Sequence, residues 1–152
     1  MTGQGVGAGD AQGALEEALA DWCARYVTAF VAYDATAIAR HWAFPALIVQ
    51  DGKRFAFSDD GAFTKNTGAL LGFYEAQGVA AAERSLLSAV ALGEGTAAIG
   101  VEDIMRSGNG GEIVRWRAGY VLSLVEGDWR AVMADAGGET RAWAARGTPL
   151  GG

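Results

Sequence analysis

The chain has 152 residues, which is an ordinary size for one domain with a single hydrophobic core. Apolar residues make up 51% of it, so it is not an intrinsically disordered protein. Its net charge of -6 opposes binding to nucleic acid, because that binding depends on clustered lysine and arginine side chains.

The two ends of the chain are rich in glycine, whose backbone entropy opposes order. We therefore expect flexible tails over residues 1–11 and 138–152, and one domain over residues 12–137. The first residues lack the basic cluster and apolar core of a signal peptide, and no run approaches the ~20 apolar residues of a membrane span. Cys23 is the only cysteine, which excludes an intrachain disulfide and fits a reducing compartment. These features favour a cytoplasmic protein.

A long amphipathic helix is expected over residues 12–33. Apolar side chains recur there at spacings of three and four, which is the pattern of a helix with one buried face. The apolar stripe consists of Leu15, Leu19, Trp22, Tyr26, Phe30 and Tyr33. Cys23 lies inside this helix, so we expect it to be a small buried residue and not a nucleophile.

A short second helix and a hairpin follow. Asp34 can accept hydrogen bonds from the free amides of a helix that continues to Trp42 and is stopped by Pro45. Two strands, at residues 46–50 and 53–57, then flank an Asp-Gly pair that tolerates the positive φ angles of a tight turn.

The rest of the domain is expected to contain one helix and then only strands. Ser58 or Asp59 can cap the third helix, which ends at Gly78. Residues 80–136 form four strands of an antiparallel meander. Glycine-bearing turns divide these strands at residues 93–95, 108–111 and 126–128. Helices followed by a curved sheet give an α+β fold.

The order of these elements resembles a known family. The order helix, helix, hairpin, helix, meander, the segment RYVTAFVAYDATAI and the turn Gly-Asp-Trp-Arg at residues 127–130 are similar to the nuclear transport factor 2-like superfamily, particularly its bacterial SnoaL-like branch, over residues 15–136. The resemblance implies a cystatin-like cone, in which three N-terminal helices pack in a curved, mainly antiparallel sheet around an internal pocket. It also implies frequent dimerisation through the outer sheet face. Members include isomerases, cyclases, dehydratases, hydrolases and transport adaptors, so the fold does not decide the function.

The steroid isomerases of this superfamily can be compared with the chain residue by residue. Tyr26 occupies the place of their oxyanion-donating tyrosine in the first helix. Gln50 stands where they carry the aspartate base, with Asp51 one residue later, and glutamine cannot take a proton. Gly119 or Tyr120 falls where they carry a protonated aspartate. Steroid isomerase chemistry is therefore not expected.

Strand register brings two carboxylates onto one apolar face. Residues 96–106 and 112–124 each have one apolar face, and matching these faces places Asp103 opposite Trp116. A two-residue turn at Glu126 and Gly127 would then place Asp135 opposite Ala118, on the same face.

If this face is the concave one, as the resemblance implies, Asp103 and Asp135 are candidate catalytic residues at the pocket mouth. Burial there would raise their pKa values, as a general acid requires. In the alternative interpretation both carboxylates lie at strand ends in solvent. Their partners would then be among Arg115, Arg117 and Arg130.

Tyr26 and His41 complete the catalytic candidates. Tyr26 is either an oxyanion donor or a core aromatic residue whose hydroxyl has a local partner. His41 is the only histidine, and it either faces inward as a base, caps local carbonyls or lies at the surface. No metal-ligand spacing, nucleophile elbow or phosphate-binding turn accompanies them, so we expect no metal and no cofactor.

The expected ligand site is an aromatic pocket. It would be formed by Trp22, Tyr26, Trp42, Trp116 and Tyr120. We therefore predict a homodimeric protein that binds a small apolar molecule and pairs through the outer sheet face, where Arg115 and Arg117 lie beside apolar residues. A solvated outer face is the alternative to pairing. The alternative function is a cofactor-independent isomerase, cyclase, dehydratase or hydrolase that uses the pocket carboxylates, and a third is a structural dimerisation module with a filled cavity.

Overall fold

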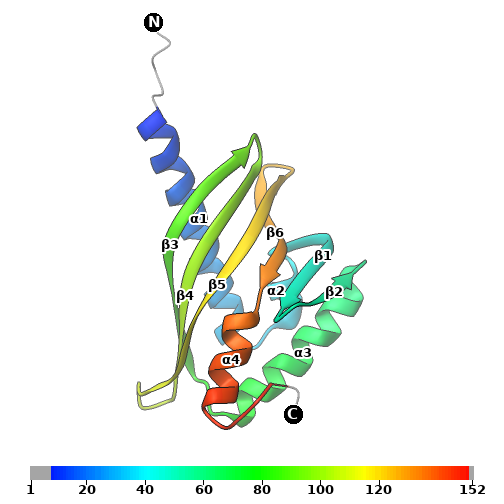
Figure 1. Ribbon diagram of the computed structural model, residues 1–152, viewed down its shortest axis with the longest axis vertical. Helices are drawn as coiled ribbons and strands as arrows, with labels where there is room; N and C mark the ends of the chain where they lie inside the picture. The colour runs from blue at the N-terminus through cyan, green and yellow to red at the C-terminus, as the bar shows by residue number, and fades with distance from the viewer. Residues whose placement is uncertain (1–7, 151–152) are drawn as a thin grey trace, which may run out of the picture.

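The computed structural model describes residues 8–150 of the chain. This part folds into a curved sheet whose inner face is packed against helices (Figure 1). The predicted α+β arrangement is confirmed. No helix within the described residues is both long enough and apolar enough to cross a membrane.

Four helices occur in the described residues. They are α1 (Ala8–Val31), α2 (Ala35–Ala39), α3 (Asp60–Ala76) and α4 (Gly137–Ala145). Asp34 and Asp59 cap α2 and α3 as predicted, because each side chain accepts a hydrogen bond from the amide three residues later. The predicted N-terminal tail is wrong for residues 8–11, which belong to α1, and residues 1–7 lie outside the described residues.

Six strands form one sheet in the order β2-β1-β6-β5-β4-β3. They are β1 (Trp42–Gln50), β2 (Lys53–Phe57), β3 (Ala81–Gly93), β4 (Thr96–Arg106), β5 (Glu112–Val125) and β6 (Asp128–Asp135). The predicted hairpin and meander are confirmed, and the only parallel pairing among these strands joins β1 to β6. The second helix ends before Trp42, because Trp42 already pairs with Ala131 of β6.

The register between β4 and β5 is the predicted one. Asp103 lies opposite Trp116, and every second residue of β4 is buried from Ala97 to Met105. A strand exposes alternate residues to opposite faces, so Asp103 points to the inner side of the sheet.

The predicted register of β6 is wrong beyond its middle. The pairing with β5 shifts by one residue between Leu122 and Val121, so that Asp135 lies opposite Gly119 and not Ala118. An extra residue in one strand turns the following side chains to the opposite face. Ala134 therefore faces inward, while Asp135 is exposed.

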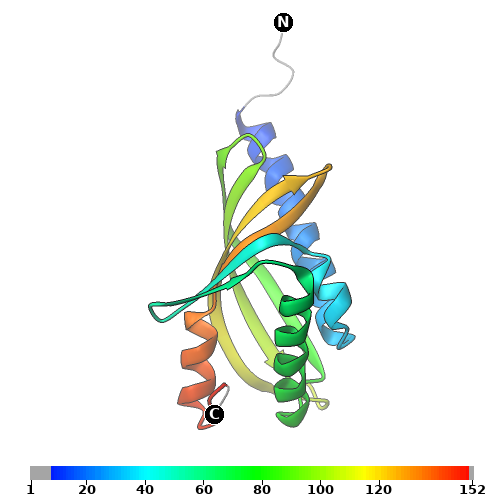
Figure 2. The same ribbon diagram turned by 90° about the vertical axis from the view of Figure 1, so that its right-hand side faces the viewer.

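The predicted C-terminal tail is wrong over residues 138–145, because α4 forms there. This helix lies at the lower end of the sheet, across from α3 (Figure 2). Trp143 has no exposed surface, and its ring packs against Phe73, Tyr74 and Trp116. Gly138 allows the close approach of α4 to the sheet, because a Cβ atom there would overlap the Arg117 carbonyl oxygen.

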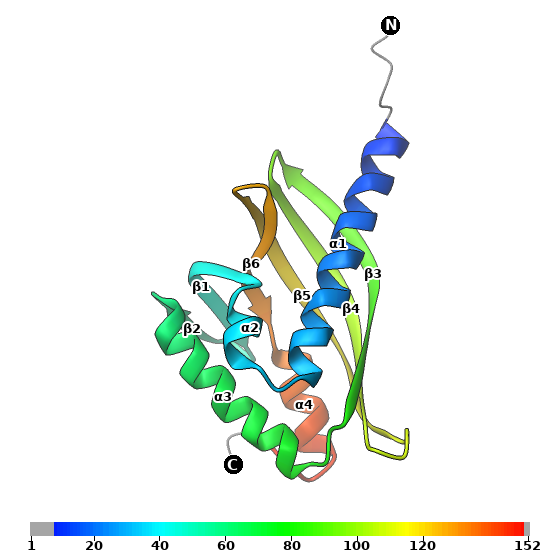
Figure 3. The same cartoon turned by 180° about the vertical axis from the view of Figure 1, so that it is seen from behind.

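The inner face of the sheet and the helices enclose the core. Figure 3 shows α1, α2 and α3 in front of the sheet. Trp22 and Leu19 of α1 are fully buried and pack with inner residues of the meander such as Ile99 and Leu122. Cys23 is also buried, and burial raises the pKa of its thiol to about 11, so the thiol is a poor nucleophile.

Candidate functional site

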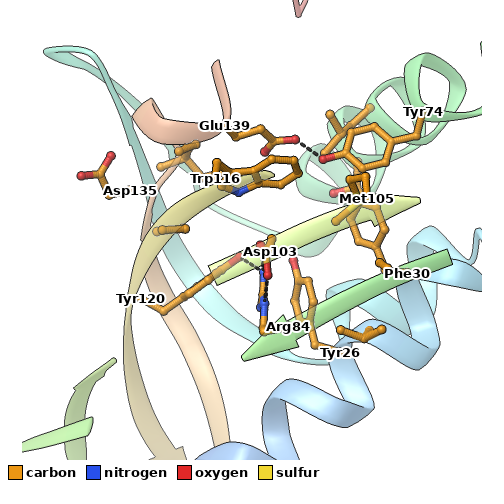
Figure 4. Close-up of a pocket in the computed structure, with 18 of the residues that line it drawn as sticks. Tyr26, Phe30, Tyr74, Arg84, Asp103, Met105, Trp116, Tyr120, Asp135 and Glu139 are labelled. Atoms are coloured by element: carbon orange, nitrogen blue, oxygen red, sulfur yellow. Dashed lines mark hydrogen bonds and ion pairs between the residues drawn. The ribbon is translucent and has the colours of Figure 1, made fainter. Parts of the chain in front are cut away.

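An internal chamber of about 100 Å³ lies between the helices and the inner face of the sheet. Its wall is mainly aromatic and aliphatic, with contributions from α1, α3, α4, β1 and the four strands of the meander (Figure 4). A chamber of this composition suits an apolar guest that is oriented by a few polar groups.

A wider groove of about 780 Å³ lies next to the chamber. It runs between α3, the β1–β2 hairpin and the segment that follows α4, and Phe55, Phe57 and Phe73 supply much of its apolar surface. The two spaces share lining residues, namely Ile48, Asn66, Leu70, Ala136 and Glu139. The groove therefore adjoins the chamber.

A buried ion pair lies deep in the chamber. Arg84 of β3 donates from Nε to Oδ1 of Asp103 at 2.7 Å and from Nη2 to Oδ2 at 2.8 Å. Both side chains are almost fully buried, with 6% and 4% of their surface exposed. Such a two-point contact compensates the cost of desolvating both charges only when the geometry is good, as it is here.

Two tyrosine rings enclose the guanidinium of Arg84. Its Cζ atom lies 4.8 Å from the centre of the Tyr26 ring and 4.7 Å from that of Tyr120. Arg84 Nη2 also donates to the Tyr120 hydroxyl at 2.8 Å. Burial by itself would lower the pKa of Arg84, but Tyr120 and Asp103 raise it well above its ordinary value. The guanidinium is therefore a permanent positive charge.

Both tyrosine hydroxyls near Arg84 stay protonated. Burial raises the pKa of Tyr26, and it raises the pKa of Tyr120 well above the ordinary value. The Tyr26 hydroxyl oxygen accepts a hydrogen bond from Trp42 Nε1 at 3.2 Å. Each hydroxyl accepts a hydrogen bond and keeps a proton that it can donate, and neither can act as a base near neutral pH.

A second polar pair lies where the chamber meets the groove. The Tyr74 hydroxyl of α3 donates to the carboxyl group of Glu139 in the first turn of α4, and Trp143 Nε1 lies 3.4 Å from the same oxygen. Burial raises the pKa of Glu139 to about 7. A carboxyl group with this pKa can hold or release a proton near neutral pH.

The sequence of the chain matches a known family. The model of an NTF2-like protein family (DUF6841) matches residues 16–138. The chain belongs to this family. The match confirms the predicted membership of the nuclear transport factor 2-like superfamily. No curated protein sequence matches the chain.

Solved structures with low sequence identity share this fold. An NTF2-like protein of unknown function from Shewanella oneidensis aligns with a TM-score of 0.63 at 9% identity, over 79% of this chain and 96% of its own. A candidate scytalone dehydratase from Novosphingobium aromaticivorans aligns with a TM-score of 0.63 at 13% identity, over 84% and 85%. A ketosteroid isomerase-like protein from Erwinia carotovora atroseptica aligns with a TM-score of 0.59 at 14% identity, over 78% and 92%. These similarities concern the NTF2-like fold alone.

Most of the residues predicted to line the pocket do so. They are Tyr26, Trp42, Asp103, Trp116, Tyr120 and, at the rim, Asp135. Trp22 does not line the chamber, because it is fully buried behind the rings of Tyr26 and Tyr120. Its part is to support the two tyrosines that enclose Arg84.

Two of the four catalytic candidates lie apart from the polar groups of the chamber. Asp135 lines the chamber at its rim, as predicted, but it is exposed there, and its carboxylate accepts a hydrogen bond from the Gly137 amide at the start of α4. Figure 4 shows it away from Arg84 and Asp103. His41 is not among the chamber residues, and its Nδ1 binds the Ala37 carbonyl at 2.9 Å, which is the local contact expected in the alternative interpretation.

Gln50, which stands at the position of the isomerase base, does not line the chamber. Gln50 ends β1 and lines only the outer groove, whereas Tyr120 does lie in the chamber. Within residues 8–150, no three histidine, cysteine, aspartate or glutamate side chains come together as ligands for a metal.

The sequence analysis missed Arg84, Tyr74 and Glu139 as site residues. Arg84 could have been found by continuing the register one strand further, because it lies directly opposite Asp103 in the β3–β4 pairing. Glu139 was missed because it lies in residues 138–152, which were expected to form a flexible tail. The signal that it belonged to a packed helix was Trp143, an aromatic residue one turn later.

Proposed function

We propose that this protein binds a small, largely apolar molecule in the chamber and the adjoining groove. The observation that carries the proposal is an aromatic chamber that contains a buried ion pair and adjoins an apolar groove. A cavity filled by side chains, as a purely structural module would have, does not fit this arrangement. Polar groups inside an otherwise apolar wall are the usual means of orienting a ligand.

Titration calorimetry with acetophenone and with the hydrocarbon α-methylstyrene tests this proposal. Ala118 lines the chamber between Trp116 and Tyr120, so Ala118→Leu should fill it and weaken binding of both compounds at least about tenfold. Ala20→Leu, on the exposed side of α1, is the matched control and should bind as the wild type does. Absence of binding to the wild type, or equal binding to Ala118→Leu, would refute the proposal.

A second function is supported by Glu139. Its pKa of about 7 and its hydrogen bond from Tyr74 suit an enzyme that removes or returns a proton on a bound molecule. The isomerase and dehydratase names of two structural neighbours fit the same class of reaction. In this proposal Glu139 has the catalytic role that the sequence suggested for Asp103 and Asp135. Asp103 instead holds the Arg84 side chain in place.

Deuterium exchange tests the enzyme proposal. Transfer of a methyl proton of acetophenone to Glu139 would let solvent deuterium enter that methyl group, and NMR would follow its loss of signal. Glu139→Gln should abolish the catalysed exchange, whereas Glu75→Gln, on the exposed side of α3, should leave it unchanged. Exchange in the Glu139→Gln variant equal to that of the wild type would rule out Glu139 as the base.

We also propose a homodimer that pairs through the outer sheet face. Val90, Ala98, Val121 and Met133 form a continuous row across four strands on this face, and Val90 is 54% exposed. Arg115 and Arg117 lie nearby and contact Glu102. Val121→Arg should shift the mass in analytical ultracentrifugation from dimer to monomer, and a wild-type monomer would refute the proposal. The expected cytoplasmic location also stays a proposal.

A further inference from the structure

One nitrogen of the chamber arginine lacks a protein partner. Nε and Nη2 of Arg84 bind Asp103 and Tyr120, but Nη1 is buried and has no hydrogen-bond partner within residues 8–150. A buried donor that forms no hydrogen bond is costly, and it is more costly when it carries charge. Arg84 lines the chamber, so an acceptor on a bound molecule can satisfy Nη1.

The two tyrosines beside Arg84 add further donors. The Tyr26 hydroxyl oxygen accepts from Trp42, and that of Tyr120 accepts from Arg84. Within the described residues neither hydroxyl donates its own proton to a protein group. The inner end of the chamber is therefore rich in donors and takes a group that only accepts, such as an oxygen atom with two lone pairs.

The charges of the chamber decide whether that oxygen belongs to a neutral or an anionic group. Asp103 already balances the charge of Arg84, and the nearby Glu139 becomes negative as pH rises through about 7. A carboxylate would have to lose its water shell in a chamber without net positive charge. A neutral carbonyl oxygen loses less hydration and still accepts two hydrogen bonds.

We propose that Arg84 Nη1 anchors the ligand through a carbonyl oxygen, and that the ligand class is a neutral ketone or ester with an apolar body that extends toward the groove. This proposal rests on the proposed binding function. It adds a specificity-determining residue, Arg84, and a ligand chemistry to the site.

Three probes of similar size test the anchor. Acetophenone carries a carbonyl group, α-methylstyrene has the same shape with a methylene group in place of the oxygen, and benzoate carries a charge. The wild type should bind acetophenone at least about tenfold more tightly than α-methylstyrene, because a hydrogen bond to a charged, buried donor is a strong one. It should bind acetophenone more tightly than benzoate as well.

A paired replacement isolates the contribution of the arginine. Arg84→Met combined with Asp103→Leu removes both charges together and leaves neither one buried alone. The preference for acetophenone over α-methylstyrene should fall to about one in this variant. Arg25→Met combined with Asp21→Leu removes an exposed pair on α1 and should keep the wild-type preference.

The outcomes separate the anchor from the binding function. If the wild type binds the hydrocarbon as tightly as the ketone, or if the preference survives in the paired variant, the anchor is refuted while binding stands. If it binds neither compound, both proposals fail. Tighter binding of benzoate would overturn the neutral ligand class.

A measurement on the wild type covers the case in which the paired variant does not fold. The guanidinium NMR signals of Arg84 should shift when acetophenone is added and should shift much less with α-methylstyrene. Equal shifts with the two compounds would refute a direct contact between the carbonyl oxygen and Arg84.

Discussion

The two polar pairs of the site, Arg84 with Asp103 and Tyr74 with Glu139, differ in position, in contacts and in whether their charge can change. Arg84 and Asp103 lie on neighbouring strands, in direct cross-strand register, and hold each other at two points. Glu139 lies on α4, outside the sheet, and its proton is exchanged near neutral pH. Arg84 and Asp103 keep their charges, whereas Glu139 can change its charge. In the two proposed functions, binding would depend on the first pair and proton transfer on the second.

The largest effect is expected when Arg84 is replaced and its buried partner Asp103 is kept. Arg84→Met should lower the free energy of unfolding by about 3–5 kcal/mol, because Asp103 is then buried without a partner. The paired Arg84→Met and Asp103→Leu variant should recover most of this loss. Urea unfolding followed by tryptophan fluorescence measures both. Equal losses in the single and the paired variant would show that the charges are not coupled as the contacts imply.

The pair of Tyr74 and Glu139, where the chamber meets the groove, should make the free energy of unfolding depend on pH. Glu139 has its pKa raised from 4.5 to about 7, so the folded state binds more protons than the unfolded state between these values. The contribution of Glu139 is therefore complete below about pH 4.5 and is lost as pH rises to about 7, by up to about 3 kcal/mol. Glu139→Gln should remove this slope, while Glu94→Gln, in the β3–β4 turn, should not. If the wild type became more stable relative to Glu139→Gln as pH rises from about 4.5 to about 7, the raised pKa of Glu139 would be contradicted.

The attachment of α4 can be weakened without replacing a residue of either pair. Gly138→Ala places a Cβ atom against the Arg117 carbonyl, which should cost about 1–3 kcal/mol and speed hydrogen exchange in α4. Gly13→Ala is the matched control, since nothing lies within 4 Å of its Cβ position in α1, and it should stabilise by roughly 0.5–1 kcal/mol. Unchanged exchange in α4 would mean that the helix is not held by this contact.

The smallest effect is expected for a surface pair. Arg25 and Asp21 form an ion pair at 2.8 Å one turn apart on α1, with about half or more of each side chain exposed. Arg25→Met should change the free energy of unfolding by less than about 1 kcal/mol. A loss as large as that of Arg84→Met would show that burial is not what distinguishes the two pairs.

The sequence predicts the fold well where a pattern repeats over several residues. The helix stripe and the alternation along β4 and β5 each contain many positions that agree, so one misleading residue changes little. Asp103 was placed correctly because its register is supported by the whole apolar face.

Prediction from the sequence failed where the structure depends on one local feature and not on a repeated pattern. One shifted residue in β6 left Asp135 exposed at the rim of the chamber instead of beside Asp103, and nothing in its sequence marks the shift. The glycine-rich end of the chain made the segment after β6 resemble a tail, although Gly138 in that segment is needed for α4 to approach the sheet. The consequence is that half of the polar site, Glu139 with Tyr74, depends on an element that the sequence did not reveal.

The central claim is that a small molecule binds inside the chamber, and the tryptophan indole signals test it most directly. Trp42 and Trp116 line the chamber, whereas Trp129 does not. In nitrogen-proton correlation spectra of the wild type, acetophenone should shift the indole signals of Trp42 and Trp116 in a saturable way and leave that of Trp129 in place. Unchanged signals for Trp42 and Trp116 at millimolar ketone, or a shift confined to Trp129, would contradict the claim.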